Sequence, residues 1–165
     1  MKRKLFFLIY VVLLVLTAIA YVYYIDYKNK RQLQDSISCY SQIQYDYVSD
    51  KKTVVIQAGI FFFLSNGHGV ISYSGTLTDQ DDVYTLRRDA EVNYKVKNDN
   101  SFFIVTKKLS IAPFDTLPTA LAKKYLYGYL REEKGWTNMS IQRNGENGYL
   151  ISTNPLPQLL CHFAK

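Results

Sequence analysis

The sequence predicts a mainly β (α+β) protein with an N-terminal transmembrane helix, in which one further helix accompanies an antiparallel curved sheet or partial barrel. Three observations lead to this fold class. A single unbroken apolar run lies near the N-terminus, from Leu5 to Ile25. Most of the remaining chain alternates apolar and polar residues with a period of two, which is typical of half-buried strands. Helical spacing returns only once, after Pro113 and Pro118.

The apolar run LFFLIYVVLLVLTAIAYVYYI has about 21 residues and contains no charge, Pro or Gly. As a helix it rises roughly 30 Å, the thickness of the hydrocarbon core of a bilayer. The basic cluster before it, Lys2 to Lys4, is tighter than the one after it, so the positive-inside rule favours a cytoplasmic N-terminus. We therefore expect a cytoplasmic N-terminus at 1–4, a transmembrane helix at 5–25, a linker at 26–36 that could also continue the helix, and a periplasmic β-rich domain at 37–165.

A cleaved signal peptide is the alternative for this segment. Ala18-Ile19-Ala20 has the small-x-small spacing of a signal peptidase site. The apolar run nevertheless continues past Ala20 to Ile25, which favours a retained anchor in the inner membrane. Either interpretation exports the rest of the chain.

Alternation predicts a strand from Ile37 to Tyr47, and turn residues separate it from the strands that follow. The motif Ser65-Asn66-Gly67-His68-Gly69 predicts a hairpin turn. A helix is expected from Thr116, as its cap, to about Glu133, and an apolar tail from Leu156 to Phe163 is expected to be held against the body. The other expected strands are 53–64, 70–78, 83–97, 102–111, 137–143 and 149–152.

The net charge of +6 does not indicate nucleic-acid binding. Residues 1–31 hold six of the 20 Lys and Arg and one of the 14 acids, which leaves 14 basic and 13 acidic residues in the rest. A nucleic-acid interface requires a basic patch, and none is visible in the exported part. The 15 Tyr and nine Phe suit strands, and they suit a cavity or interface with an apolar body and a polar rim.

The two cysteines, Cys39 and Cys161, lie near the start and the end of the exported part. In an oxidising compartment such a pair predicts a disulfide. Two buried free thiols are the alternative.

The residue types that enzymes and metal sites need do not cluster in this sequence. His68 lies in a turn and His162 adjoins Cys161, so neither suggests catalysis. The segment TDQDDV lacks the Gly and the distal Glu of a calcium loop. We therefore expect no catalytic residues, no metal, no cofactor and no enzymatic activity.

A curved aromatic-rich sheet can enclose an apolar pocket. Arg88 is the only charged residue on the apolar side of its strand. It could face the acid group of an amphipathic ligand, or it could lie at a strand end or bulge or extend its charge to solvent. The candidate pocket residues are Ile60, Phe62, Tyr84, Leu86, Arg88, Tyr94 and Phe103.

The start MKRKLFFLIYVVLLVL, one span and a β-rich domain of roughly 135 residues together resemble the FidL-like inner-membrane proteins of enteric bacteria. These are similar in plan to the ToxS and VtrC type partners of membrane-bound transcription factors. The resemblance implies a periplasmic domain that pairs with the periplasmic domain of a ToxR-like single-pass regulator. It also implies a lipocalin-like barrel that can hold a bile salt or another amphipath.

Two functions are consistent with these features. In the first, the protein stabilises a membrane-bound regulator and binds a small amphipath. In the second, it is an anchored envelope assembly or structural protein with no small ligand. In both, the partners include membrane lipid and exclude nucleic acid.

Overall fold

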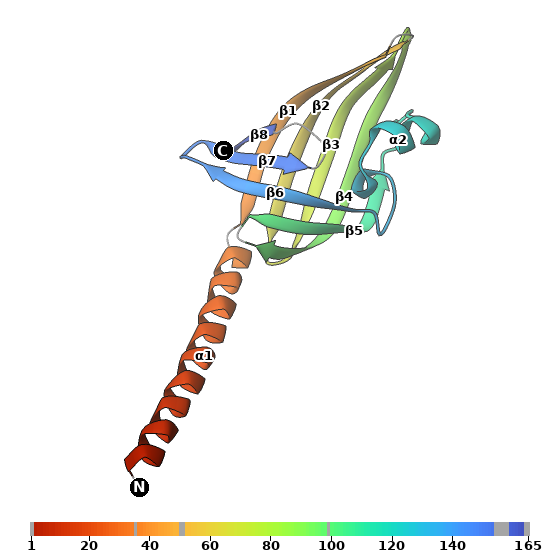
Figure 1. Cartoon of the computed structure of the whole chain (residues 1–165). Coiled ribbons are helices and arrows are strands. Elements are labelled where there is room, and N and C mark those ends of the chain that lie inside the picture. The colour runs from red at the N-terminus through yellow and green to blue at the C-terminus, as the bar shows by residue number, and fades with distance from the viewer. Residues whose placement is uncertain (1, 35, 50–51, 99, 154–158, 164–165) are drawn as a thin grey trace.

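The computed structural model describes residues 2–34, 36–49, 52–98, 100–153 and 159–163, and within these it leaves out the side chains of 2–9, 26, 28–34 and 98. One long helix leads into a β domain (Figure 1). The elements are α1 Lys2–Gln34, β1 Ile37–Ser49, β2 Lys52–Ser65, β3 His68–Asp79, β4 Asp82–Asn98, β5 Ser101–Ile111, α2 Thr119–Tyr125, the 3₁₀ turn η1 Gly128–Leu130, β6 Trp136–Asn144, β7 Gly148–Thr153 and β8 Leu159–Phe163.

The β domain is a closed antiparallel barrel in which each strand pairs with the next and β8 pairs with β1. The mainly β class is confirmed, but the expected partial barrel is wrong, because the tail contains a strand that completes the ring. Leu159, Cys161 and Phe163 alternate with more exposed neighbours, which is the period of a strand. Residues 156–158 of the predicted tail lie outside the described residues.

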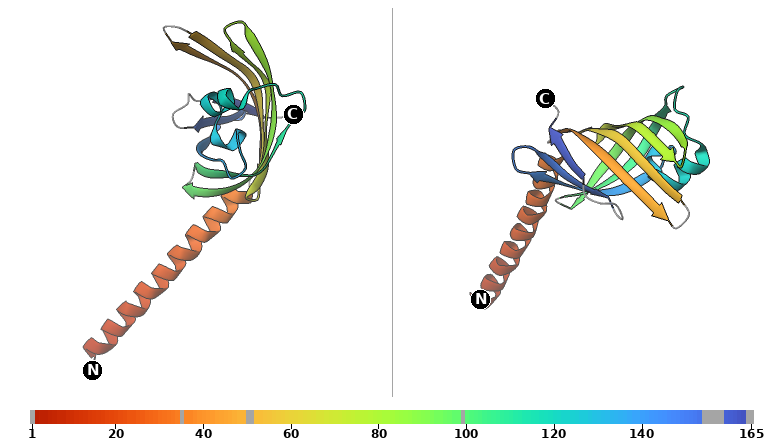
Figure 2. Two further views of the ribbon diagram at one scale, coloured as in Figure 1. Left: turned by 90° about the vertical axis from the view of Figure 1, so that its right-hand side faces the viewer. Right: turned by 90° about the horizontal axis from the view of Figure 1, so that it is seen from above.

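Closure is confined to the end of the barrel near α1. There Cys39 pairs with Phe163 and Tyr40 pairs with His162. The predicted disulfide is confirmed: Cys39 and Cys161 are bonded across this seam, with their Cα atoms 5.4 Å apart and 122 residues between them in sequence. Beyond the seam, β1 to β4 continue together as a flared four-stranded wall (Figures 1 and 2).

The turns define two ends of the domain. The β2–β3 and β4–β5 turns lie at the end from which α1 leaves, which we call the α1 end (Figure 1). The β1–β2 and β3–β4 turns lie at the opposite, distal end. The predicted hairpin turn at the α1 end is confirmed, since Asn66 and Gly67 have φ of 51° and 83°.

The predicted helix from Thr116 to about Glu133 is wrong in extent. Only α2 and the short η1 are helical, because Leu126 and Tyr127 between them are extended. The proposed cap has another role, since the Thr116 hydroxyl accepts a hydrogen bond from the Thr85 backbone N–H at 2.9 Å. Breaking the helix allows this segment to turn into the concave side of the barrel wall (Figure 2).

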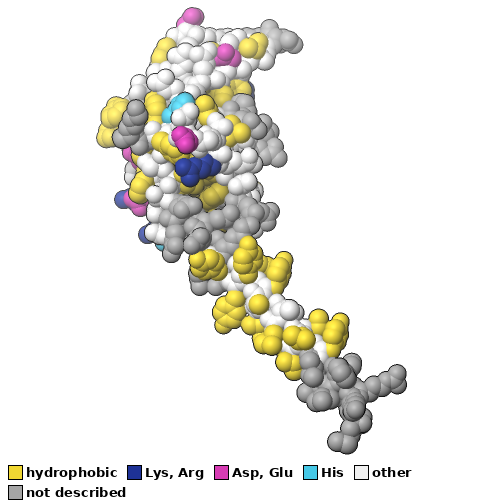
Figure 3. Space-filling model, turned by 90° about the vertical axis from the view of Figure 1, so that its left-hand side faces the viewer, with side chains coloured by type: hydrophobic (Ala, Val, Ile, Leu, Met, Phe, Trp, Pro, Cys, Tyr) yellow, Lys and Arg dark blue, Asp and Glu magenta, His cyan; other side chains and the backbone are white. Residues whose placement is uncertain are grey.

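The helix α1 includes the whole predicted span, and it continues through residues 26–34, so the predicted linker is mostly a continuation of the helix. Its side chains from Tyr10 to Ile25 are apolar and mostly exposed (Figure 3). Of the anchor limits Leu5 and Ile25, the side chain of Leu5 lies outside the described residues. In α1, the described side chains are those of 10–25 and 27. Among the described residues, no helix is both long enough and apolar enough to cross a bilayer.

Candidate functional site

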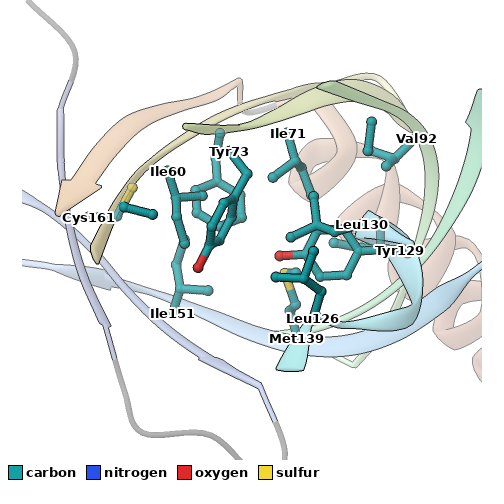
Figure 4. Close-up of a cluster of buried hydrophobic side chains, with 14 of the residues drawn as sticks. Ile60, Ile71, Tyr73, Val92, Leu126, Tyr129, Leu130, Met139, Ile151 and Cys161 are labelled. Carbon is teal, nitrogen blue, oxygen red and sulfur yellow. The ribbon is translucent and has the colours of Figure 1, made fainter. Parts of the chain in front are cut away.

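The interior of the barrel is filled by protein. Leu126, Tyr129 and Leu130 come from the α2–η1 segment and point towards Ile71 and Met139 on the surrounding strands (Figure 4). Tyr129 is 2% exposed and Leu130 is fully buried. We call residues 126–130 the plug. It occupies the space in which an open barrel of this size would hold a ligand.

Two side chains from the barrel wall fasten the plug through its carbonyl groups. The Thr106 hydroxyl on β5 donates to the Tyr129 carbonyl oxygen at 2.8 Å. The Nη1 of Arg88 on β4 donates to the Leu130 carbonyl oxygen at 3.0 Å. Both carbonyls are thereby satisfied in a buried place, where an unpaired polar group would be costly.

Arg88 completes a buried ion pair with Asp115. Its Nε lies 3.0 Å from Oδ2 of Asp115, and the two side chains are only 5% and 1% exposed. The same carboxylate accepts hydrogen bonds from the backbone N–H groups of Arg87 at 3.0 Å and Leu117 at 3.1 Å. Arg88 is therefore neither at a strand end nor extended to solvent. Its charge is neutralised within the fold by the Asp115 carboxylate.

A cluster of tyrosine side chains joins the plug and α2 to β1 and β3 of the wall. The rings of Tyr47 and Tyr125 are 5.1 Å apart, and those of Tyr127 and Tyr129 are stacked at 5.7 Å. Tyr73 lies in the hydrophobic core and Tyr45 packs against it; burial raises the pKa of Tyr73, and the nearby phenols of Tyr45, Tyr47 and Tyr127 add to the rise. We call these residues the tyrosine cluster; its members are Tyr45, Tyr47, Tyr73, Tyr125, Tyr127 and Tyr129.

Solvent exposure falls across the tyrosine cluster, from half-buried residues at its rim to buried residues at its floor. Tyr47 and Tyr125 are half-buried, whereas Tyr73 is 3% exposed. Burial raises the pKa of the Tyr73 and Tyr129 phenols far above their ordinary value near 10. Burial also raises the pKa of Tyr127, partly offset by a hydrogen bond from Thr153 at 3.1 Å. The phenols are therefore neutral at physiological pH and able to donate hydrogen bonds.

A cation lies beside the rim of the tyrosine cluster. Lys52 forms an ion pair with Asp79, and its hydrogen bond to that carboxylate raises the pKa of the lysine. The nearby phenols of Tyr125 and Tyr84 add to the rise in the pKa of Lys52. The rim thus combines aromatic faces and hydroxyl donors with a lysine whose charge is balanced by Asp79.

The outer half of β1 has an open edge. On one side β1 pairs with β2 along its full length, from Ile37 to Ser49. On the other side, within the described part of the chain, its pairing with β8 ends at Tyr40. An unpaired edge presents free N–H and C=O groups that can pair with another strand. The tyrosine cluster lies beside this edge, because two of its members, Tyr45 and Tyr47, are residues of β1 in the unpaired part.

The corresponding edge of β4 is covered. Ala112 and Thr116 donate their backbone N–H groups to the carbonyl oxygens of Arg87 and Thr85, at 3.1 Å and 3.0 Å. Asp115 and Thr116 accept the N–H groups of the same two β4 residues through their side chains. The open edge of β1 is therefore a distinct feature of the distal half of the domain.

The predicted pocket residues are mostly part of the packed core. Ile60, Phe62, Leu86 and Tyr94 are all at most 4% exposed and pack in the barrel interior. Tyr84 lies near the rim of the tyrosine cluster. Phe103 does not line the interior, because the alternation of β5 turns Phe102 and Ile104 inward and Phe103 outward against Trp136, at 5.8 Å.

The prediction missed most of the tyrosine cluster. Tyr45 and Tyr47 carried a usable signal, because they continue the period-two face that begins at Ile37. Tyr125 and Tyr127 carried none, since a continuous helix would have placed them on different faces. The described residues contain no group of three or more His, Cys, Asp or Glu side chains that could hold a metal ion.

Comparison with known proteins identifies one family. The family described as "FidL-like putative membrane protein" matches residues 75–161, from the middle of β3 into β8. No curated protein and no solved structure matches the chain. The match includes Arg88 and Asp115, the plug and Cys161.

Proposed function

The chain belongs to the FidL-like family, and from that premise we propose that it is a membrane-anchored periplasmic partner of a ToxR-like single-pass transcription regulator. In this proposal it stabilises the regulator through their periplasmic domains. A small amphipath such as a bile salt binds at the tyrosine cluster and adjusts that contact.

The anchor is α1, inserted in the inner membrane with the N-terminus in the cytoplasm. The uncharged run from Leu5 to Ile25 supports this, as do the exposed apolar side chains of α1, such as Leu13, Leu16 and Val22, which are 55–66% exposed. A helix that is apolar all round requires an apolar environment. The disulfide between Cys39 and Cys161 supports an oxidising compartment for the β domain.

The open edge of β1 is the observation that carries the proposal. A strand of the regulator can pair with Gln42 to Ser49 and extend the wall by β-augmentation. Such a strand would also lie beside Tyr45 and Tyr47. One surface would then serve both partners, so an amphipath at the tyrosine cluster could strengthen or weaken the pairing.

A second function is supported by the plug. Because Leu126, Tyr129 and Leu130 already fill the interior, the barrel can be stable with no small ligand. The protein would then be an envelope assembly factor that uses the open edge alone.

Co-purification separates these functions. A regulator with one span and a cytoplasmic winged-helix domain is first sought beside the gene and then co-expressed with the full chain. We expect the two to co-purify, and we expect a bile salt to change the yield of the complex. Co-purification without any effect of bile salts would support the assembly function. Failure to co-purify under every condition would refute the proposed partnership.

A further inference from the structure

A group of basic and aromatic side chains lies on the outer face of β4, β5 and β6. The Lys97 ammonium lies 4.8 Å from the centre of the Phe103 ring, and Phe103 packs against Trp136. Lys95 is the cross-strand partner of Phe103. Both lysines are exposed, and Trp136 is 59% exposed. We call Lys95, Lys97, Phe103 and Trp136 the basic–aromatic patch.

The balance of charge changes along the outer face of β4, from ion pairs towards the distal end to lysines towards the α1 end. Towards the distal end, Nη2 of Arg87 lies 3.8 Å from Oδ1 of Asp89, and Nζ of Lys108 lies 3.9 Å from Oε1 of Glu91. Towards the α1 end, Lys95 and Lys97 have no carboxylate within ion-pair distance among the residues that the structure describes. The basic–aromatic patch is therefore a site of net positive charge next to exposed aromatic surface.

The basic–aromatic patch belongs to the α1 end of the domain. Lys97 is the second-last residue of β4, and α1 contacts β4. β5 crosses the barrel at the end from which α1 leaves (Figure 1). The nine helical residues 26–34 add about 14 Å to α1 beyond Ile25. The headgroup layer occupies roughly 5–8 Å of this distance, so long side chains at the base of the domain can reach it.

We propose that the basic–aromatic patch docks on the anionic phospholipid surface of the membrane that holds α1. Lysine ammonium groups bind lipid phosphates, and tryptophan partitions into the headgroup region. This contact fixes the tilt of the barrel, and it turns the distal end and the open edge of β1 away from the bilayer. The inference rests on the proposed role of α1 as the anchor.

Trp136 provides the measurement, because it is the single Trp of the chain. The full chain is placed in nanodiscs of phosphatidylcholine alone, or of equal parts phosphatidylcholine and phosphatidylglycerol. Each contains a trace of lipid with a nitroxide on its headgroup, which quenches only tryptophan nearby. We expect clearly stronger quenching of Trp136 in the anionic nanodiscs, and loss of that difference in about 1 M salt, where the Debye length is about 3 Å.

The test variant is K95Q/K97Q, and K123Q/K124Q on α2 is the control with the same change in net charge. Removing two lysines from an anionic surface is expected to lower the docking constant about 30-fold. Quenching in K95Q/K97Q should fall to the level in phosphatidylcholine alone, and quenching in the control should not change. Circular dichroism checks that both variants fold.

Three outcomes would overturn the inference: equal quenching in both lipids, no response to salt, or equal loss in the two variants. Failure of the anchor is seen separately. If α1 does not insert, the protein does not co-elute with nanodiscs of either composition, and the proposed function fails together with the inference.

Discussion

At the scale of single residues, we expect the side chain of Asp115 to contribute most to the stability of the fold. Its carboxylate neutralises Arg88 and accepts two backbone N–H groups, from Arg87 and Leu117. Arg88 in turn holds the Leu130 carbonyl of the plug. A buried pair of this kind costs desolvation energy, but removing one partner costs more, because it leaves a buried charge uncompensated.

Asp115→Asn should therefore lower the free energy of unfolding by about 3–5 kcal/mol. Urea denaturation of the full chain in detergent micelles measures this loss. Glu91→Gln is the matched control, because its partner Lys108 lies 3.9 Å away and the two side chains are 49% and 61% exposed. That change should cost less than about 1 kcal/mol. Equal losses in the two variants would show that Asp115 does not hold Arg88 in the core.

The buried phenols predict sensitivity to alkaline pH. Burial raises the pKa of Tyr73 in the folded state above the unfolded value near 10. The folded state therefore keeps a proton that the unfolded state loses. Stability is fully present below about pH 10 and falls above it, by about 1.4 kcal/mol per pH unit for each such group. Denaturation curves from about pH 8 to about pH 11 measure this slope.

Tyr73→Phe should make that alkaline slope shallower, because one group that releases its proton only on unfolding has been removed. Tyr40→Phe, on the outer face and 42% exposed in the native chain, serves as the control and should leave the slope unchanged. If the slopes of the wild type and Tyr73→Phe coincide, the phenol of Tyr73 is not buried in the folded barrel.

At the scale of elements, β8 decides whether the barrel is closed. It is only five residues long and pairs with β1 at two positions, so the disulfide has a large share in holding the seam. A crosslink between residues 122 apart removes much of the freedom of the unfolded chain, worth about 4–5 kcal/mol in the entropy model.

C39S/C161S should lower the free energy of unfolding by a similar amount, about 4–5 kcal/mol at most. Hydrogen exchange should also become faster in β8 and at the start of β1, while β2 and β3 keep their protection. Urea denaturation and mass-spectrometric exchange measure the two effects. Uniformly faster exchange over the whole barrel would indicate that the seam is not a separate weak point.

The sequence predicted the strands well because period-two alternation is a local signal. β1, β2 and β4 match the expected segments closely, and the Asn66-Gly67 turn has the expected conformation. The break between α2 and η1 was not predicted, because the apolar residues of this segment also fit the stripe of one continuous helix. Only the barrel interior, which forms from distant strands, requires Leu126 and Tyr127 to be extended.

The open edge of β1 could not be located from the sequence either. Whether an edge is covered depends on which distant segments reach it. Asp115 and Thr116 cover β4, and β8 reaches only the first residues of β1. The sequence indicated that Arg88 was unusual, but its partner Asp115 lies 27 residues away in a loop with no pairing signal.

At the scale of the whole molecule, the domain has two ends of different character. The α1 end contains the proposed anchor α1, the disulfide-bonded seam and the basic–aromatic patch. The distal half contains the tyrosine cluster and the open edge of β1. In the proposed function, this division keeps the open edge of β1 accessible to a partner while α1 holds the other end at the membrane.

Site-specific photocrosslinking in living cells tests the central claim, that the open edge of β1 receives a strand of a membrane-bound regulator. A photoreactive residue replaces Gln44 on β1 or, as the control, Thr85, which lies in the same cross-strand row three strands away on the covered edge. We predict that the Gln44 position forms an adduct with a single-span winged-helix regulator and that the Thr85 position does not. Adducts with that regulator at both positions, or at neither, would contradict the account.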